Sequence, residues 1–138
     1  MVARGIDLKV CYLLADYRSH RRAGLDNLRC LSNAGLTIVD DPADADVVVI
    51  HDEPATYPSY FRAFPVLRQR YTVAYAVWEP GILAPDLFRW FGLVDEIWTA
   101  SSYCARILLQ AGNPVTVVPH VVAPPHPDQA LSDRSRRR

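Results

Sequence analysis

The segment Leu8–Ala15 (LKVCYLLA) is an almost unbroken apolar run that ends at the polar stretch Asp16–His20 (DYRSH). A run of this kind is typical of a parallel β-strand that is buried on both faces of its sheet. Between Leu25 and Ala34, apolar residues then recur at helical spacing, and Gly35 stands where a left-handed cap would end a helix. The run Leu8–Ala15 is therefore expected to be the first central strand of an α/β domain, followed by a loop and a helix.

The remainder of the chain continues this alternation of strands and helices. Further apolar runs of strand length lie at Leu36–Val39, Val47–Ile50, Thr72–Trp78, Glu96–Ala100 and Val115–Val118. Helices are predicted for Ser59–Arg70, with a kink or a late start at Pro65, for Pro85–Phe91, and from Ser101 or Ser102 through Ala111, with Gly112 as the C-terminal cap. This order predicts a Rossmann-like, doubly wound parallel sheet of about six strands in a single domain.

The composition indicates one domain with a core. The chain has 138 residues, of which 50% are hydrophobic. From Pro124 onward it becomes Pro-rich, then polar and basic (PPHPDQALSDRSRRR), so we expect a domain over residues 1–123 and a disordered or linker tail over residues 124–138. Acidic and basic residues balance at 15 each, which gives no electrostatic reason to expect a nucleic-acid partner.

Cysteine usage and hydropathy favour a cytoplasmic location. Cys11, Cys30 and Cys104 are far apart and lie in apolar or helical stretches, so they are expected to be reduced core residues. No apolar run approaches the roughly 18 to 20 residues that a membrane span needs, and the sequence does not open with a signal-peptide pattern. We therefore expect a cytoplasmic protein without a transmembrane segment, which can still sit against a membrane as a peripheral protein.

Ligands of an open parallel sheet bind beyond the carboxyl ends of its strands, so the residues that follow the predicted strands form the candidate site. These residues are Asp16, Arg18, His20, Arg21, Arg22, Gly24, His51, Asp52, Glu53, Trp78, Glu79, Ser101, Ser102 and His120. If the predicted fold is right, they converge at one edge of the sheet.

The first of these loops carries a basic group. Arg18, Arg21 and Arg22 lead into a helix whose free amides and dipole favour an anion, so a phosphate or diphosphate would be a suitable ligand. The alternative is that these arginines are solvated side chains of the first helical turn. Gly24 alone does not make a GxGxxG pattern, which disfavours a nucleotide-binding oxidoreductase.

Two further groups are candidates for proton transfer or sugar recognition. His51, Asp52 and Glu53 place three titratable groups at one strand end, where burial and like charges can tune a general base; the alternative is an Asx-type turn with a hydrogen-bonded His. Glu79 ends an apolar strand beside Trp78, and a carboxylate beside an aromatic ring suits a sugar or polyol. Its alternative roles are to cap the following helix or to pair with an Arg. The sequence shows no metal-ligand spacing, nucleophile elbow or P-loop.

Three segments together resemble a known enzyme family. Ala74–Pro80 (AYAVWEP), Val94–Ser102 (VDEIWTASS) and Val115–Val122 (VTVVPHVV) are similar in order and spacing to the N-terminal domain of bacterial family 4 glycosyltransferases, mannosyltransferase-like members especially. The resemblance implies a GT-B enzyme, in which two Rossmann-like domains face a cleft. It also implies no metal requirement, a nucleotide sugar held mainly by the C-terminal domain, an acceptor held mainly by the N-terminal domain, and transfer with retention of configuration.

The resemblance also implies roles for single residues. Glu79 falls where the family has acceptor-side or reaction-centre residues, and His51, Ser101 and His120 map to loops that face the cleft. Gly24 stands near a Gly-Gly pair whose amides approach the donor diphosphate, although this chain has only one of the two glycines. The Glu-x7-Glu type signature of the donor domain does not occur in the chain, so the donor site is expected on a separate or missing domain.

The leading hypothesis is the acceptor-binding half of a hexosyltransferase, which acts on a glycan, lipid-linked or small-molecule acceptor and is inactive without a donor-binding domain. The expected catalytic residues are Glu79 and His51, and the expected substrate-binding residues are Arg18, Arg22, Gly24, Asp52, Glu53, Trp78, Ser101 and His120. No metal or cofactor is expected, and the nucleotide sugar is a co-substrate. The alternative is a non-catalytic Rossmann-like binding or assembly module, which associates with itself or a partner through an exposed apolar edge.

Overall fold

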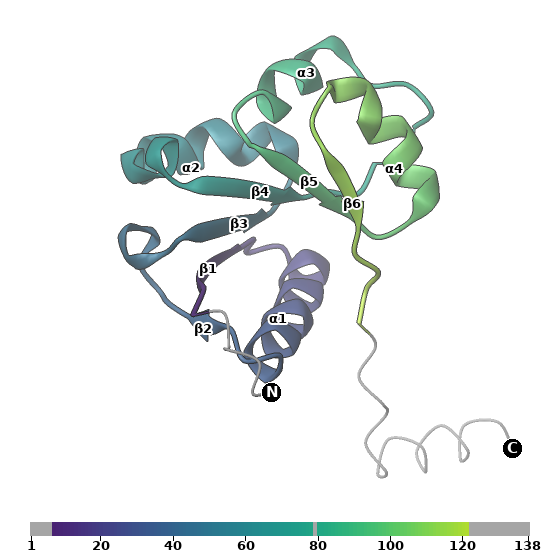
Figure 1. Cartoon of the computed structure of the whole chain (residues 1–138). Helices are drawn as coiled ribbons and strands as arrows, with labels where there is room; N and C mark the ends of the chain where they lie inside the picture. The colour runs from purple at the N-terminus through teal and green to yellow at the C-terminus, as the bar shows by residue number, and fades with distance from the viewer. Residues whose placement is uncertain (1–6, 79, 122–138) are drawn as a thin grey trace, which may run out of the picture.

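Six parallel strands form a single sheet in the computed structural model, which describes residues 7–78 and 80–121 (Figure 1). The strands are β1 (Lys9–Leu14), β2 (Thr37–Ile38), β3 (Val47–His51), β4 (Tyr71–Tyr75), β5 (Glu96–Thr99) and β6 (Val115–Val117). They lie in the order β2-β1-β3-β4-β5-β6, and each neighbouring pair is parallel. The Rossmann-like α/β domain predicted from the apolar runs is confirmed.

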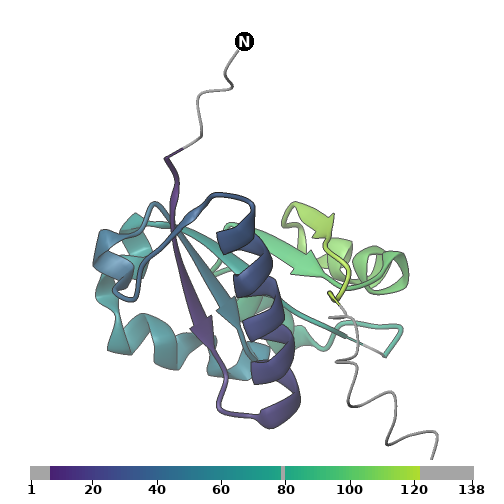
Figure 2. The same ribbon diagram turned by 90° about the horizontal axis from the view of Figure 1, so that it is seen from below.

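Helices cover both faces of this sheet (Figure 1). One face carries α1 (Arg18–Asn33), and the other carries α2 (Tyr57–Ala63), α3 (Pro85–Phe91) and α4 (Ser102–Leu108). Figure 2 shows α1 in front of the sheet, alongside β1. Four short 3-10 turns complete the described elements: η1 (Pro42–Asp44), η2 (Pro54–Thr56), η3 (Pro65–Gln69) and η4 (Leu109–Ala111).

The central strands are buried on both faces, as their unbroken apolar sequence requires. Val48 and Ile50 of β3 belong to the core under α2, α3 and α4, whereas Val49 between them belongs to the core under α1. All three side chains are 0% exposed. Burial of one such side chain contributes about 1.5–3 kcal/mol, so both cores hold β3 in place at the centre of the sheet.

The second predicted helix is wrong in its extent. The helix begins at Tyr57 and ends at Ala63, so Ser59, at which the predicted helix begins, lies inside α2. Phe64 then adopts φ −126° and ψ 80°, outside the helical region, since the ring of Pro65 clashes with a helical residue before it. The chain continues as η3 rather than as the same helix.

The first helix begins earlier than its apolar spacing indicates. It starts at Arg18, not near Leu25, so the arginines expected in a loop belong to its first turns. The preceding Tyr17 makes no side-chain cap and the first turn has no acidic residue, so the usual signals of a helix start are missing here.

The fourth strand ends at Tyr75 and not at Trp78, and α4 ends at Leu108 and continues as η4. The predicted caps at Ser101, Gly35 and Gly112 are confirmed. The Ser101 hydroxyl accepts a hydrogen bond from the backbone N–H of Cys104 at 3.2 Å and caps α4. Gly35 and Gly112 adopt φ values of +92° and +88° after α1 and η4, where a left-handed residue was expected.

Three remaining sequence expectations concern the rest of the chain. Cys11 and Cys104 are buried free thiols, but Cys30 is exposed, because α1 turns Asn27 and Leu31 toward the sheet instead. No helix within residues 7–78 and 80–121 is long and apolar enough to cross a membrane. Glu79, the domain boundary at residue 123 and the tail over 124–138 lie outside the described residues.

Candidate functional site

A pocket of about 350 Å³ opens at the carboxyl edge of the sheet. Its lining residues are Ser19, His20, Ala23, His51, Asp52, Glu53, Pro54, Tyr75, Val77 and His120. The pocket lies between β1, from which the chain leads into α1 on one face, and β3, from which it leads into α2 on the other. Ligands of doubly wound sheets bind at this kind of topological switch point.

The floor of the pocket is a stack of two aromatic rings. His51 is the last residue of β3, and its ring lies on that of Tyr75 at the end of β4, with centroids 4.4 Å apart and an angle of 24° between the ring planes. The two residues are 3% and 1% exposed. The parallel register of β3 and β4 places them side by side, since Ile50 pairs with Ala74 one residue before.

A buried hydrogen-bond network with Tyr12 and Asn27 fixes the position of the His51 ring. The Tyr12 hydroxyl of β1 lies 2.6 Å from Nδ1 of His51, and Nδ2 of Asn27 in α1 donates to the same hydroxyl at 3.2 Å. Burial raises the pKa of Tyr12, so its hydroxyl keeps its proton. His51 is therefore fixed by residues from β1 and α1 as well as by its own strand.

Gly24 brings α1 close enough for this network to form. A Cβ atom at this position would clash with Cδ2 of Leu14 and would lie 3.2 Å from Nδ1 of His51. Asn27 follows about one helical turn later and reaches Tyr12. The Gly24 N–H lies inside α1, where helical hydrogen bonding uses it, so the glycine serves helix–sheet packing.

The His51 imidazole is neutral at physiological pH. Burial, together with smaller effects of His20 and His120, lowers its pKa from 6.5 to about 4, against the opposing effect of Asp52. The floor of the pocket is consequently uncharged.

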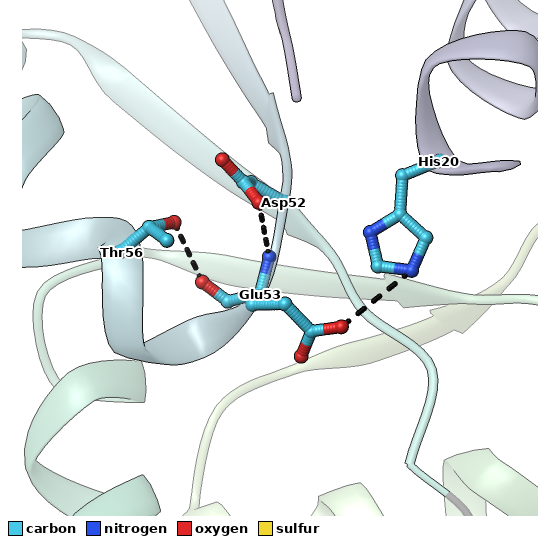
Figure 3. A network of polar contacts seen from close by, with 4 residues as sticks. All are labelled: His20, Asp52, Glu53 and Thr56. Atoms are coloured by element: carbon cyan, nitrogen blue, oxygen red, sulfur yellow. Dashed lines mark hydrogen bonds and ion pairs between the residues drawn. The ribbon is translucent and has the colours of Figure 1, made fainter. Parts of the chain in front are cut away.

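Asp52 and Glu53 form the wall that follows β3. Asp52 Oδ1 accepts a hydrogen bond from the Glu53 N–H, and its Oδ2 accepts one from the Tyr60 hydroxyl, both at 2.7 Å. The Glu53 carbonyl accepts a hydrogen bond from the Thr56 hydroxyl at 2.7 Å, which stabilises the turn into η2 (Figure 3). Asp52 is thus held in place at both oxygens, while the Glu53 side chain is exposed.

Two further histidines stand at the rim. Nε2 of His20, from the first turn of α1, lies 3.6 Å from Oε1 of Glu53 (Figure 3). The His20 ring centroid is 6.0 Å from that of His51, and the His120 centroid is 5.7 Å from that of Tyr75. Three imidazoles and two carboxylates therefore border one pocket.

The structure brings together only part of the predicted site. His20, His51, Asp52, Glu53 and His120 line the pocket. The other described candidates do not line it: Asp16, Arg18, Arg21, Arg22, Gly24, Trp78, Ser101 and Ser102.

These residues lie elsewhere for identifiable reasons. Arg18 and Arg22 are exposed on the first turns of α1. Trp78 is half-buried against the core, and its Nε1 donates to the Ile82 carbonyl at 3.2 Å. Ser101 is occupied as the cap of α4.

Sequence reasoning missed Tyr12, Asn27 and Tyr75. Both tyrosines lie inside apolar strands, where an aromatic residue is expected in the core. The sequence did contain a signal, namely a tyrosine within an aliphatic strand. The hydroxyl of a buried tyrosine needs a hydrogen-bond partner, which predicts a polar contact there. Asn27 gave a similar signal as an amide on the apolar face of α1.

No group of three or more His, Cys, Asp or Glu side chains in the described part of the chain is arranged to hold a metal ion. Comparisons with protein-family models, with curated proteins and with solved structures found no match for this chain. The function is therefore inferred from the site and from the sequence motifs.

Proposed function

We propose that this domain is the acceptor-binding half of a nucleotide-sugar-dependent hexosyltransferase of the GT-B type. The resemblance of residues 74–122 to family 4 glycosyltransferases supports the class of enzyme. The observation that carries the acceptor role is the pocket at the switch point, whose aromatic floor is uncharged and whose rim is rich in hydrogen-bonding groups. The acceptor is a glycan, a lipid-linked sugar or a small hydroxylated molecule.

The chemistry of the pocket suits a neutral polyhydroxylated ligand. The Asp52 and Glu53 carboxylates accept hydrogen bonds from hydroxyl groups, and the imidazoles of His20 and His120 donate or accept them. Among the described residues that line the pocket, none is Lys or Arg, so a phosphate would meet carboxylates without a cationic partner. We therefore expect the sugar ring of the acceptor, and not a phosphate group, to occupy the pocket.

The surroundings of the pocket favour a second protein surface opposite it. Tyr17, after β1, is 70% exposed, and Ile82, after β4, is 78% exposed. Val77, at the pocket itself, is 41% exposed. Exposed apolar side chains at the pocket and in the segments that follow β1 and β4 fit a facing donor-binding domain, which would cover them.

The same exposed side chains favour the second candidate function, a non-catalytic module that assembles through this edge. Sedimentation equilibrium of the full chain separates the two proposals. A monomer that binds sugar supports the acceptor half, whereas a stable oligomer without sugar binding supports the assembly module.

Sugar binding is tested by 1H–15N NMR titration of the full chain with methyl α-mannoside, methyl α-glucoside and inositol. We expect shifts at His51, Tyr75 and His120, with a Kd of ~1 mM, which corresponds to a binding free energy of about −4 kcal/mol. Glu53→Gln should weaken binding, and Asp44→Asn, an exposed acid in η1, is the matched control. Shifts that are scattered over the surface, or equal in the two variants, would contradict the proposal.

Transfer itself is tested by adding a nucleotide-sugar-binding GT-B domain and its donor to the chain. We expect transfer only when both proteins are present. Sugar binding without transfer would leave a binding module and would refute the hexosyltransferase proposal.

A further inference from the structure

The order of donors and acceptors in the network of Asn27, Tyr12 and His51 determines which ring nitrogen of His51 carries the proton. Asn27 donates one hydrogen bond, through Nδ2, to the Tyr12 hydroxyl oxygen at 3.2 Å. The hydroxyl has a single proton of its own, and Nδ1 of His51 lies 2.6 Å from the oxygen. Asn27 approaches the oxygen with a donor, so Nδ1 is the one acceptor among the described residues that lies within hydrogen-bond distance of this hydroxyl. Its proton is therefore directed to Nδ1. A neutral imidazole that accepts at Nδ1 carries its proton at Nε2.

We infer that Tyr12 and Asn27 are positioning residues that fix His51 in the Nε2–H tautomer, so that His51 offers a hydrogen-bond donor to an oxygen atom of the ligand. No residue in the described part of the chain hydrogen-bonds to Nε2, and His51 lines the pocket. Nε2 is thus the nitrogen that remains for a ligand. The inference about the ligand rests on the proposed sugar binding, whereas the tautomer does not.

This assignment changes the expected role of His51 in the reaction. An Nε2–H group cannot accept a proton from a ligand hydroxyl at the same time as it donates one. His51 is therefore a recognition residue and not the general base that its position after β3 suggested. Burial, which lowers the pKa of this imidazole, agrees with a group that stays neutral when the ligand binds.

The pocket then has a distinct pattern of donors and acceptors. His51 at the floor donates, while Asp52 and Glu53 on the wall accept. A ligand with neighbouring hydroxyl groups satisfies both, since one hydroxyl oxygen accepts from His51 and the other hydroxyls donate to the carboxylates. The ligand class that fits is a polyol or sugar with a free oxygen acceptor directed at the floor.

The tautomer is measured directly by long-range 1H–15N correlation spectra of the full chain labelled with 15N-histidine. At neutral pH we expect the Nε2–H pattern for His51, with the signal assigned by its loss in His51→Gln. In Tyr12→Phe the fixed proton donor is gone, so we expect a mixture of the two tautomers. Tyr60→Phe, which removes the hydroxyl that binds Asp52, is the matched control and should keep the wild-type pattern.

Asn27→Asp gives a stronger test, because an ionised carboxylate can only accept. The Tyr12 proton would turn to it, and His51 would donate from Nδ1, so the Nδ1–H pattern should appear. An Nδ1–H or doubly protonated His51 in the wild-type chain at neutral pH would overturn the inference. The wild-type spectrum, assigned with His51→Gln, decides this even if the Tyr12 and Asn27 variants do not fold.

The ligand role of Nε2–H is tested with deoxy and deoxyfluoro analogues of the sugar that binds. At one ring position the fluoro analogue, which still accepts weakly, should bind more tightly than the deoxy analogue. At the positions that face the carboxylates both analogues should lose affinity equally. Equal losses at every position would refute the donor role of His51, and absence of binding by any sugar would refute the proposed function while leaving the tautomer to the spectra.

Discussion

The stability of the domain should depend on pH through His51. Burial lowers the pKa of this imidazole from 6.5 to about 4, with smaller contributions from His20 and His120 and an opposing one from Asp52. In the unfolded chain the same side chain titrates near 6.5. Between the two values the unfolded chain binds a proton that the folded protein does not, so stability falls as the pH falls through this window.

The size of the effect follows from the two pKa values. Their difference, at ~1.4 kcal/mol for each pKa unit, corresponds to ~3 kcal/mol between pH 6.5 and pH 4. The contribution is fully present above pH 6.5 and fully lost below pH 4. Because a domain of this kind is stable by only about 5–15 kcal/mol, the loss is a substantial part of the total.

Urea unfolding followed by tryptophan fluorescence measures this contribution across the pH window. The comparison is with His51→Gln, which does not titrate and whose amide oxygen can still accept from Tyr12. The two proteins differ in this side chain alone, so the difference between the two pH profiles isolates His51. We expect wild type to lose ~3 kcal/mol more than the variant on going to pH 4. Parallel profiles would refute the burial of a neutral His51.

Three further predictions concern single side chains. Tyr57→Phe should raise the unfolding free energy by ~1 kcal/mol, because the Tyr57 hydroxyl is buried without a partner among the described residues. Tyr60→Phe should lower the unfolding free energy, because it loses the hydrogen bond to Asp52. Urea unfolding midpoints measure both changes. Ser101→Ala should cost ~1 kcal/mol through the lost cap of α4, with Ser102→Ala nearly neutral, and a destabilisation equal in the two variants would contradict the cap. Glu79→Gln should reduce transfer by ~100-fold in the two-domain assay if the resemblance places this residue correctly, and undiminished transfer would remove it from the site.

The fold was predictable because hydrophobic burial leaves a direct trace in the sequence. A strand such as Val47–His51 lies between two helical layers, so it must be apolar along its length and can be recognised without its neighbours. The start of α1 could not be recognised in this way, since the residue before Arg18, Tyr17, makes no side-chain cap. The break at Phe64 was predictable in kind from Pro65, but whether proline kinks or ends a helix depends on packing.

The residues at the rim of the pocket could be predicted from the sequence, whereas the tyrosines at and under its floor could not. His51, Glu53 and His120 follow strand ends, and the general rule for parallel sheets directed attention to them. Tyr12 and Tyr75 belong to strands that pair with β3 on opposite sides, and strand order is not written in the sequence. The order and register of the strands in the structure are needed to show that Tyr12 and Tyr75 both contact His51.

Packing and site chemistry depend on the same contact at Gly24. Its missing Cβ lets α1 approach Leu14 and His51, and this approach brings Asn27 to the Tyr12 hydroxyl. A side chain at position 24 would separate the helix from the sheet without touching a ligand, and the His51 proton would lose its fixed position. The glycine thus acts on recognition through the distance between a helix and a sheet, which is a physical requirement for glycine that does not involve a diphosphate.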